Sequence, residues 1–269
     1  MKTSSLRPAV TAVAAVTLTA LSLFASCAQA QACSKQSPGY SVALFELYTS
    51  EGCSSCPPAD KYLSELRSKH FAPEQAVLLS MHVDYWNDIG WKDVYSKRVL
   101  TERQRWLSAL AGSRTIYTPE VFMGGQELRG GVDGWRNAVP EAVKRINSRP
   151  AQADIHIALG KLNGNSLPLE VNVKAKQNGK LFVALVESGL VSEVKSGENS
   201  GAVLKHDYVV REWLAPVSLS GDASQTRAAL TRAISLPAGA NSKNMGIAAF
   251  VQNDKGEVLQ ALSLPLCNG

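Results

Sequence analysis

The sequence predicts an α/β protein in two parts, a segment of order βαβαββα followed by a β-rich, sandwich-like segment. Apolar runs of strand type alternate with helical periodicity between residues 40 and 149. Beyond Arg149-Pro150 the hydrophobic period changes to two, which is typical of antiparallel strands. The chain has 269 residues and is 45% hydrophobic, enough for one large domain or two ordinary ones. We therefore expect one domain over residues 40–149 and a second over residues 150–269.

Residues 1–30 have the features of a secretory signal peptide. Lys2 and Arg7 precede an apolar run over residues 9–24, and Ala28-Gln29-Ala30 is a small-x-small cleavage pattern. The apolar run is shorter than a transmembrane helix requires. A secreted or periplasmic location is therefore predicted.

Cleavage after Ala30 would leave an N-terminal extension, residues 31–39, before the first domain. It would also reduce the basic residues from 28 to 26 against 23 acidic ones, a net charge of +3. The net charge is small and the basic residues are scattered, which argues against nucleic acid as a partner. Alternatively, Phe24-Ala25-Ser26-Cys27 resembles a lipoprotein signal, and only lipidation of Cys27 would bring the protein to a membrane.

The first domain is expected to begin with a βαβ unit. Val42–Thr49 is an apolar strand, a helix with one apolar face extends from Pro57 to Lys69, and Ala76–Val83 is a second strand. Asp93 could be the N-cap of a second helix that extends to about Ala111.

Two short strands and a helix complete this domain. Glu120–Met123 and Glu127–Gly130 flank Gly124-Gly125-Gln126, which suits a hairpin turn with positive φ. A last helix is expected over Asp133–Ser148, with Pro140 dividing or kinking it.

The second domain is predicted to be a small antiparallel sandwich or sheet. Asn178-Gly179 and the segment 253–256 are turn sequences between its strands. One helix is expected near Ala223–Ala233. The expected strands are Ile155–Leu159, Leu169–Ala175, Leu181–Glu187, Val209–Trp213, Ile247–Gln252 and Val258–Leu264.

Cys53-Ser54-Ser55-Cys56 is the predicted chemical centre. It comes directly after the first strand and directly before the helix that begins at Pro57. Two thiols at this spacing can form a disulfide, and a helix N-terminus favours the thiolate of the first. The predicted chemistry is thiol–disulfide exchange. The alternatives are an inert structural disulfide or part of a zinc site, although the sequence has no second Cys-x-x-Cys.

The βαβαββα order, with Cys53 and Cys56 at a helix start and Tyr117-Thr118-Pro119 before the third strand, resembles thioredoxin. The resemblance covers residues 40–148. It implies that Pro119 follows a cis peptide bond and that Thr118 and Pro119 lie against the dithiol, where their backbone can pair with a bound substrate chain.

The motifs also resemble a family of secreted bacterial proteins of unknown function, DUF1223. The similar segments are 45–60, 82–86, Gly90-Trp91-Lys92-Asp93 and 117–119. This resemblance implies a thioredoxin-like fold with a redox-like site and no established substrate. Gly52 precedes the motif where thioredoxins have Trp, and two serines separate the cysteines. Either serine could donate a hydrogen bond to the Cys53 sulfur and stabilise its thiolate.

Polar residues of the strand before the dithiol and of the strand after it could take part in the thiol–disulfide exchange. Glu46 could be a partly buried acid that accepts the proton of Cys56, or it could be exposed at a strand edge. His82 and Asp84 alternate along their strand and so share a face, and one of them could lie under the dithiol loop.

Tyr85 and Trp86 open a loop rich in aromatic and acidic residues. They could form a wall of a substrate cleft beside the dithiol, or they could pack under the loop. No cofactor is required for thiol exchange. The alternative is copper, held by Cys53, Cys56 and His82.

Cys33 and Cys267 are expected to form a structural disulfide. Four cysteines would remain after cleavage at Ala30, an even number in an oxidising compartment. Such a bridge would join the N-terminal extension to the last strand. His206-Asp207-Tyr208 is interpreted as the end of a strand, since His206 has no evident nucleophile beside it.

The leading functional hypothesis is a secreted or periplasmic thiol–disulfide oxidoreductase whose partners are protein thiols and disulfides. In it Cys53 attacks, Cys56 resolves the mixed disulfide and Pro119 positions the partner chain. The competing hypothesis is a binding module, without enzymatic activity, that recognises a protein or captures copper. Its cysteine pair would serve as a staple or as ligands.

Overall fold

The computed structural model describes residue 1, residues 33–222 and residues 225–267. Apart from residue 1, the predicted signal peptide with Cys27 lies outside the described residues, as do the first two residues of the predicted extension.

The first part of the chain has the element order βαβαββα, as predicted. Pro57 and Pro58 occupy the first two positions of the first helix, where a missing N–H is tolerated. Gly124 and Gly125 connect two strands with φ values of 59° and 85°, which non-glycine residues rarely adopt. The elements are β2 (Ala43–Thr49), α1 (Pro57–Lys69), β3 (Ala76–His82), α2 (Arg98–Leu110), β4 (Glu120–Met123), β5 (Gln126–Leu128) and α3 (Gly131–Asn147).

The start of the second helix differs from the prediction. Helix α2 begins at Arg98 with Lys97 as its N-cap, so Asp93 does not cap it. Asp93 lies in the loop before α2, four residues ahead of the N-cap, and its carboxylate bonds to His82 instead. Helix α3 continues through Pro140 as one helix.

The second part of the chain is almost entirely strand, and the helix expected near Ala223–Ala233 is wrong. Gln225–Ser235 forms strand β14, because all ten of its residues from Thr226 onward pair with β7. A short 3₁₀ turn, η1 (Ser242–Asn244), precedes β15. The strands, with the N-terminal β1, are β1 (Cys33–Gln36), β6 (Ala153–Leu159), β7 (Ser166–Ala175), β8 (Lys180–Glu187), β9 (Leu190–Glu193), β10 (Val203–His206), β11 (Val209–Trp213), β12 (Val217–Ser218), β13 (Ser220–Asp222), β14 (Gln225–Ser235), β15 (Met245–Gln252) and β16 (Val258–Pro265).

The largest sheet contains strands from both parts of the chain. Its order is β16-β15-β8-β11-β3-β2-β4-β5, with β12 paired to β8. The two parts meet where Val209 of β11 pairs with Ser80 of β3. The sheet therefore runs across the expected domain boundary near residue 150. Independent folding of the two segments stays a prediction.

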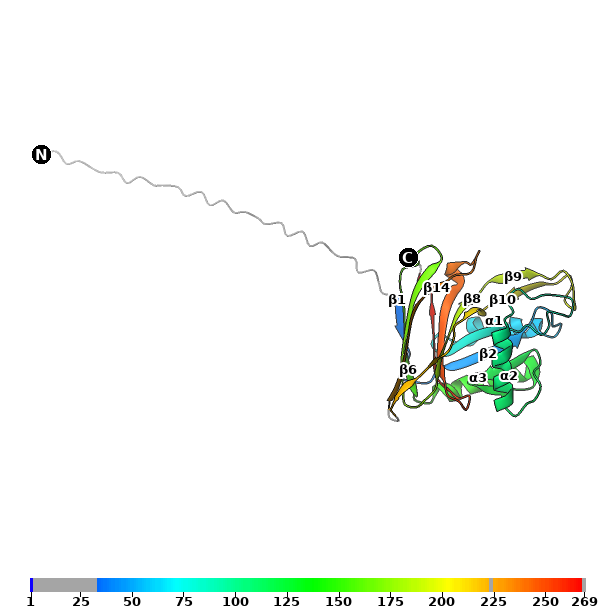
Figure 1. Ribbon diagram of the computed structural model, residues 1–269, viewed down its shortest axis with the longest axis horizontal. Helices are drawn as coiled ribbons and strands as arrows, with labels where there is room; N and C mark the ends of the chain where they lie inside the picture. The colour runs from blue at the N-terminus through cyan, green and yellow to red at the C-terminus, as the bar shows by residue number, and fades with distance from the viewer. Residues whose placement is uncertain (2–32, 223–224, 268–269) are drawn as a thin grey trace. The chain divides into compact units, whose positions relative to one another are not determined.

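The molecule from residue 33 onward is layered around this sheet. Helix α2 packs on one face. On the other face, α1 and α3 cover β2 to β4, and a second sheet of order β1-β6-β7-β14-β13 covers β8, β15 and β16. Figure 1 shows β1, β6 and β14 on the side away from the three helices. The predicted sandwich is thus built from this five-stranded sheet and half of the large one.

Candidate functional site

The Cys53–Cys56 disulfide lies in the turn between β2 and α1. The two Cα atoms are 5.4 Å apart. Cys56 is the N-cap of α1, so the positive end of the helix dipole lies at this disulfide. If the disulfide is reduced, this field favours a thiolate over a thiol.

One of the two intervening serines contacts the sulfur of Cys53. The Ser55 hydroxyl oxygen lies 3.3 Å from Cys53 Sγ. Ser54 is differently engaged, because its backbone N–H donates to Glu198 Oε2 at 3.0 Å. Ser55 is therefore the serine placed to donate a hydrogen bond to a Cys53 thiolate.

Thr118 and Pro119 lie beside the disulfide loop, and the peptide bond between them is cis. The Ser55 hydroxyl donates to the Thr118 carbonyl over 3.5 Å, a weak contact. The Thr118 hydroxyl accepts from Trp86 Nε1 at 2.8 Å. The fold thus brings Trp86, Thr118 and the loop of Cys53 together from three separate segments.

The predicted aromatic loop is part of this surface. A Cβ atom at Gly52 would come within 3.2 Å of Trp86 Cβ, so the backbone before Cys53 approaches Trp86 closely. Tyr85 turns its hydroxyl inward, and burial raises the pKa of Tyr85 to about 12. Of the two predicted contact residues, Trp86 is thus the one at the disulfide loop.

A buried pair, His82 and Asp93, lies behind the disulfide loop. His82 is the last residue of β3, and its Nδ1 lies 2.7 Å from Asp93 Oδ2. The same carboxylate accepts the backbone N–H groups of Glu51 and Tyr95, each at 2.9 Å. Asp93 therefore fixes the backbone two residues before Cys53 as well as the imidazole.

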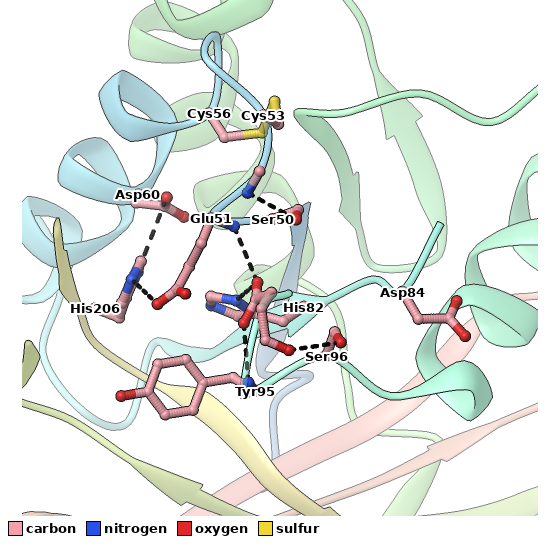
Figure 2. A network of polar contacts seen from close by, with 12 residues as sticks. Ser50, Glu51, Cys53, Cys56, Asp60, His82, Asp84, Tyr95, Ser96 and His206 are labelled. Atoms are coloured by element: carbon pink, nitrogen blue, oxygen red, sulfur yellow. Dashed lines mark hydrogen bonds and ion pairs between the residues drawn. A yellow bond between two sulfur atoms is a disulfide. The ribbon is translucent and has the colours of Figure 1, made fainter. Parts of the chain in front are cut away.

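A second buried group, Glu51, Asp60 and His206, adjoins this pair. His206 Nε2 lies 3.3 Å from Glu51 Oε1, and His206 Nδ1 lies 4.0 Å from Asp60 Oδ2. The rings of His206 and His82 are 4.9 Å apart. Figure 2 shows Glu51, Asp60 and His206 turned toward one another beneath the disulfide. Three carboxyl groups (Glu51, Asp60 and Asp93) and two imidazoles (His82 and His206) thus lie together in the interior.

The Asp60 carboxyl is the group most suited to exchanging protons near neutral pH. Burial raises its pKa from 3.8 to about 6, although the nearby His206 and His82 oppose the shift. Asp60 lies one helical turn after Cys56, and its backbone N–H donates to the Cys56 carbonyl at 3.1 Å. A weak acid thus lies on the first turn of the helix that carries the dithiol.

Three other members of the cluster, His82, Asp93 and Glu51, have pKa values that are shifted toward their charged forms. Burial alone would lower the pKa of His82, but the Asp93 carboxylate outweighs it and the pKa is raised. Burial would raise the pKa of Asp93, yet His82 lowers it. Burial would raise the pKa of Glu51, but its contact with His206 and its hydrogen bonds with Ser192 and Trp91 together lower it. The cluster therefore contains a fixed ion pair beside the titratable Asp60.

The loop between β9 and β10, residues 194–202, reaches the disulfide loop from the second part of the chain. Besides the contact from Glu198 to Ser54, Asn199 Nδ2 donates to the carbonyls of Glu51 at 2.9 Å and Cys53 at 3.0 Å. We call residues 194–202 the β9–β10 loop. It contacts the backbone on both sides of Cys53.

Glu46 is not part of this site. Its carboxylate forms a bidentate ion pair with Arg103, at 2.6 and 3.0 Å, on the face of β2 that packs against α2. Neighbours Phe45 and Leu47 point to the opposite face, which α1 covers. The alternation along β2 thus turns Glu46 away from the helix that carries Cys56.

Three other predicted residues also lie elsewhere. Asp84 accepts from the Thr101 hydroxyl at 2.6 Å and lies apart from the cluster in Figure 2. Cys33 and Cys267 form a disulfide with Cα atoms 5.8 Å apart, joining β1 to the end of the chain.

Sequence reasoning missed most of the cluster. Asp60 carried one signal, since an acid next to the apolar face of α1 is placed for burial. His206 was interpreted as the end of a strand, and nothing local indicates that β10 brings it under the disulfide. Asp93 was assigned to helix capping. Glu198 and Asn199 had no signal at all, because they lie far from Cys53 in the sequence, Asn199 by 146 residues.

Two negative findings concern the described residues alone. In residues 33–222 and 225–267, no group of three or more His, Cys, Asp or Glu is arranged to hold a metal ion, so the predicted copper ligands are not brought together. No helix in the same part of the chain is long and apolar enough to span a membrane. The two disulfides are compatible with an oxidising extracellular compartment.

Two solved structures resemble this one. Protein AGR_C_4864 from Agrobacterium tumefaciens is 26% identical, with a TM-score of 0.55 over 85% of this chain and 96% of that one. HBP35 of Porphyromonas gingivalis is 15% identical, with a TM-score of 0.64 over 86% of this chain and 76% of that one, and shows likeness of fold alone. Comparison with curated proteins gave no match.

Fold and site together define a mixed α/β protein with a disulfide at a helix N-terminus, above a buried ionisable cluster. The model of DUF1223, a family of proteins of unknown function, matches residues 44–252. The chain belongs to the DUF1223 family.

Proposed function

We propose that the protein is a secreted or periplasmic, thioredoxin-like thiol–disulfide oxidoreductase that acts on protein thiols and disulfides through Cys53 and Cys56. One observation carries the proposal. The disulfide closes at the N-terminus of α1, directly beside the Thr118-Pro119 loop and above the buried carboxyl of Asp60. A structural staple requires none of these three neighbours. The βαβαββα element order supports the thioredoxin-like assignment.

The reaction is written here in the oxidising direction. A thiolate of the substrate attacks Cys53 Sγ, a substrate–Cys53 disulfide forms, and the Cys53–Cys56 bond breaks with the electron pair on the Cys56 sulfur. A second substrate thiolate then attacks the substrate sulfur and releases Cys53 as a thiolate. The substrate loses two electrons and gains a disulfide, and the protein becomes a dithiol. The reducing direction is the reverse.

Asp60 is the group we propose for proton transfer to Cys56. A leaving thiolate must be protonated, and a resolving thiol must lose its proton. A carboxyl with a pKa of about 6 can do either near neutral pH. His206, 4.0 Å from Asp60, would stabilise the carboxylate form after the proton has left.

A trapping experiment tests this function. In a Cys56→Ser variant, a substrate bound to Cys53 cannot be released by the second cysteine, so mixed disulfides should accumulate in a periplasmic extract. A Cys53→Ser variant is the matched control and should trap nothing. The absence of Cys53-linked adducts in the first variant would remove the proposal.

The reduction potential of the disulfide then gives the direction. Equilibration of the wild-type protein with glutathione buffers, followed by thiol trapping and mass mapping, measures it. A value near or above about −180 mV would indicate an oxidant or isomerase, and one near about −270 mV a reductase.

One observation favours a second candidate, a protein-binding module with a structural disulfide. The exposed fraction of Cys53 and of Cys56 is 0%, whereas the attacked sulfur of an exchange enzyme must be reached by its partner. A reduction potential below about −300 mV would favour this candidate.

A further inference from the structure

The β9–β10 loop holds the disulfide loop by its backbone. Glu198 accepts the N–H of Ser54 at 3.0 Å, and Asn199 donates to the carbonyls of Glu51 and Cys53 at 2.9 and 3.0 Å. These three bonds bracket Cys53, the residue that a substrate thiolate would attack. Glu198 and Asn199 therefore lie against the backbone on both sides of Cys53.

A second set of contacts holds the same loop against the segment after β3. The Ser196 hydroxyl donates to the Gly90 carbonyl. Gly197 has a φ of 75°, and a Cβ atom there would lie 3.1 Å from Trp91 Cβ. The loop therefore rests on the disulfide loop at one end and on residues 90 and 91 at the other.

The hairpin that carries this loop is set apart from the main sheets. Strands β9 and β10 pair only with each other among the described strands. The hairpin is bounded by two residues with left-handed backbone, Gly189 with φ of 72° and Tyr208 with φ of 57°. His206 and Leu204 of β10 are buried, but residues 195–198 of the loop are exposed, so the loop can open locally without unfolding the rest of the protein.

Glu198 gives the loop a negative charge beside Cys53. Its pKa is lowered by the hydrogen bonds that it receives from Ser54, so the carboxylate is ionised at neutral pH. Its side chain is exposed and its neighbour Lys195 is paired with Glu193. A thiolate with a further negative charge would approach Cys53 against this carboxylate.

We propose that the β9–β10 loop is a gate over the Cys53–Cys56 disulfide. Asn199 holds this gate closed through its hydrogen bonds, and the charge of Glu198 disfavours the approach of anionic thiols. The proposal rests on the exchange function of this disulfide. It predicts substrates with neutral or basic surroundings at the reacting cysteine. It also accounts for two cysteines that are buried while the gate is closed.

The test measures how fast small thiols reduce the oxidised, full-length mature protein. The probes are cysteamine, 2-mercaptoethanol and 3-mercaptopropionate, which carry a positive, no and a negative group, with rates expressed per thiolate. The variants are Glu198→Gln and Asn199→Ala. Glu193→Gln is the control, since Glu193 lies on the same hairpin, is exposed and bonds to Lys195. Thermal unfolding checks that each variant is folded.

Asn199→Ala should increase the rate of reduction by all three thiols by a similar factor, because it removes hydrogen bonds that hold the loop closed and does not change the charge. Glu198→Gln should accelerate 3-mercaptopropionate most, by about 10-fold relative to cysteamine at low ionic strength, and salt should shrink this difference in the wild type. Glu193→Gln should behave as the wild type.

Rates in Glu198→Gln and Asn199→Ala that equal the wild-type rates for all three thiols would overturn the gate. That holds even if Cys56→Ser traps substrates, and the exchange function would then stand without it. If Cys56→Ser traps nothing but the two variants still react faster, the gate stands and the exchange function fails. If no thiol reduces any of the proteins, both are wrong.

Discussion

The Glu46–Arg103 ion pair is among the most enclosed charged groups of the molecule. Arg103 lies over the rings of Phe182 and Phe250, each 4.8 Å from the ring centroid, and also donates to Gln252 at 2.9 Å. The aromatic side chains come from the second part of the chain and the ion pair from the first. The ion pair therefore joins the two parts of the chain. The buried Arg103 needs the Glu46 carboxylate as its partner.

Replacing Glu46 with Ala should cost about 3 to 5 kcal/mol of unfolding free energy, because Arg103 would remain buried without its carboxylate. Guanidinium denaturation of the oxidised protein measures this. Glu102→Ala, which removes an exposed partner of Arg98, should cost less than about 0.5 kcal/mol. The reduction potential of Cys53–Cys56 should not change, and a clear shift would return Glu46 to the proton-transfer role that the sequence suggested.

Asp60 should make the stability of the protein depend on pH. Its pKa in the folded protein, about 6, is higher than the ordinary value of 3.8. The folded state therefore binds the proton more tightly, and this contribution is complete below pH 3.8 and is lost as pH rises through about 6.

Asp60→Asn should consequently stabilise the protein at pH 8 by up to about 3 kcal/mol, and by little at pH 3.5, where the native carboxyl is already neutral. Denaturation of oxidised protein at the two pH values measures the difference. Asp133→Asn, at an exposed position of α3, should show the same small effect at both. A gain in stability that does not depend on pH would mean that ionisation of the Asp60 carboxyl does not destabilise the folded protein.

At the scale of elements, β14 shows where local propensity misleads. Ala228, Ala229, Leu230 and Ala233 favour a helix when they are considered alone. Pairing with β7 along ten residues satisfies the backbone of the same segment, and Ala228, Leu230 and Ile234 pack against the sandwich. A long-range partner thus decides the conformation, and a local pattern cannot contain that information.

The edge strand β1 depends on its disulfide. It has four residues and pairs with β6 alone among the described strands. Replacing Cys33 and Cys267 with Ser should cost about 3 to 5 kcal/mol, because the bridge closes a loop of 234 residues in the unfolded chain. The midpoint of guanidinium unfolding measures this. An unchanged midpoint would show that β1 and the C-terminus are held by packing alone.

At the scale of the whole molecule, the large sheet decides what can fold alone. In the full chain, β3 pairs with β2 on one side and with β11 on the other. A fragment of residues 40–149 would expose that edge of β3 and leave Arg103 without Phe182 and Phe250.

We expect this fragment to aggregate or to remain without fixed packing. Size-exclusion chromatography and near-ultraviolet circular dichroism of the fragment, beside residues 31–269, would measure it. A monomeric fragment that unfolds cooperatively would instead support the domain division that the sequence suggests.

The strands and helices of the first part were largely predictable, because their apolar periodicities and their glycine and proline positions are local. The same holds for Cys53, Cys56 and the Thr118-Pro119 loop, which short motifs mark. Four features were not: the sheet that joins both parts, the capping of α2, the strand β14, and the burial of Glu46 against Arg103. The sheet, strand β14 and the burial of Glu46 each depend on a partner far along the chain, and the capping of α2 depends on Asp93 bonding to His82 instead.

The sequence by itself determined the βαβαββα order, the position of a dithiol at a helix start and the pairing of Cys33 with Cys267. Only the tertiary structure decided what surrounds that dithiol. Asp60, His82 and His206 come from α1, β3 and β10. The burial of Asp60 in the folded protein raises its pKa. Desolvation and pairing depend on distances in space, and those distances exist only once the sheet has brought its distant strands together.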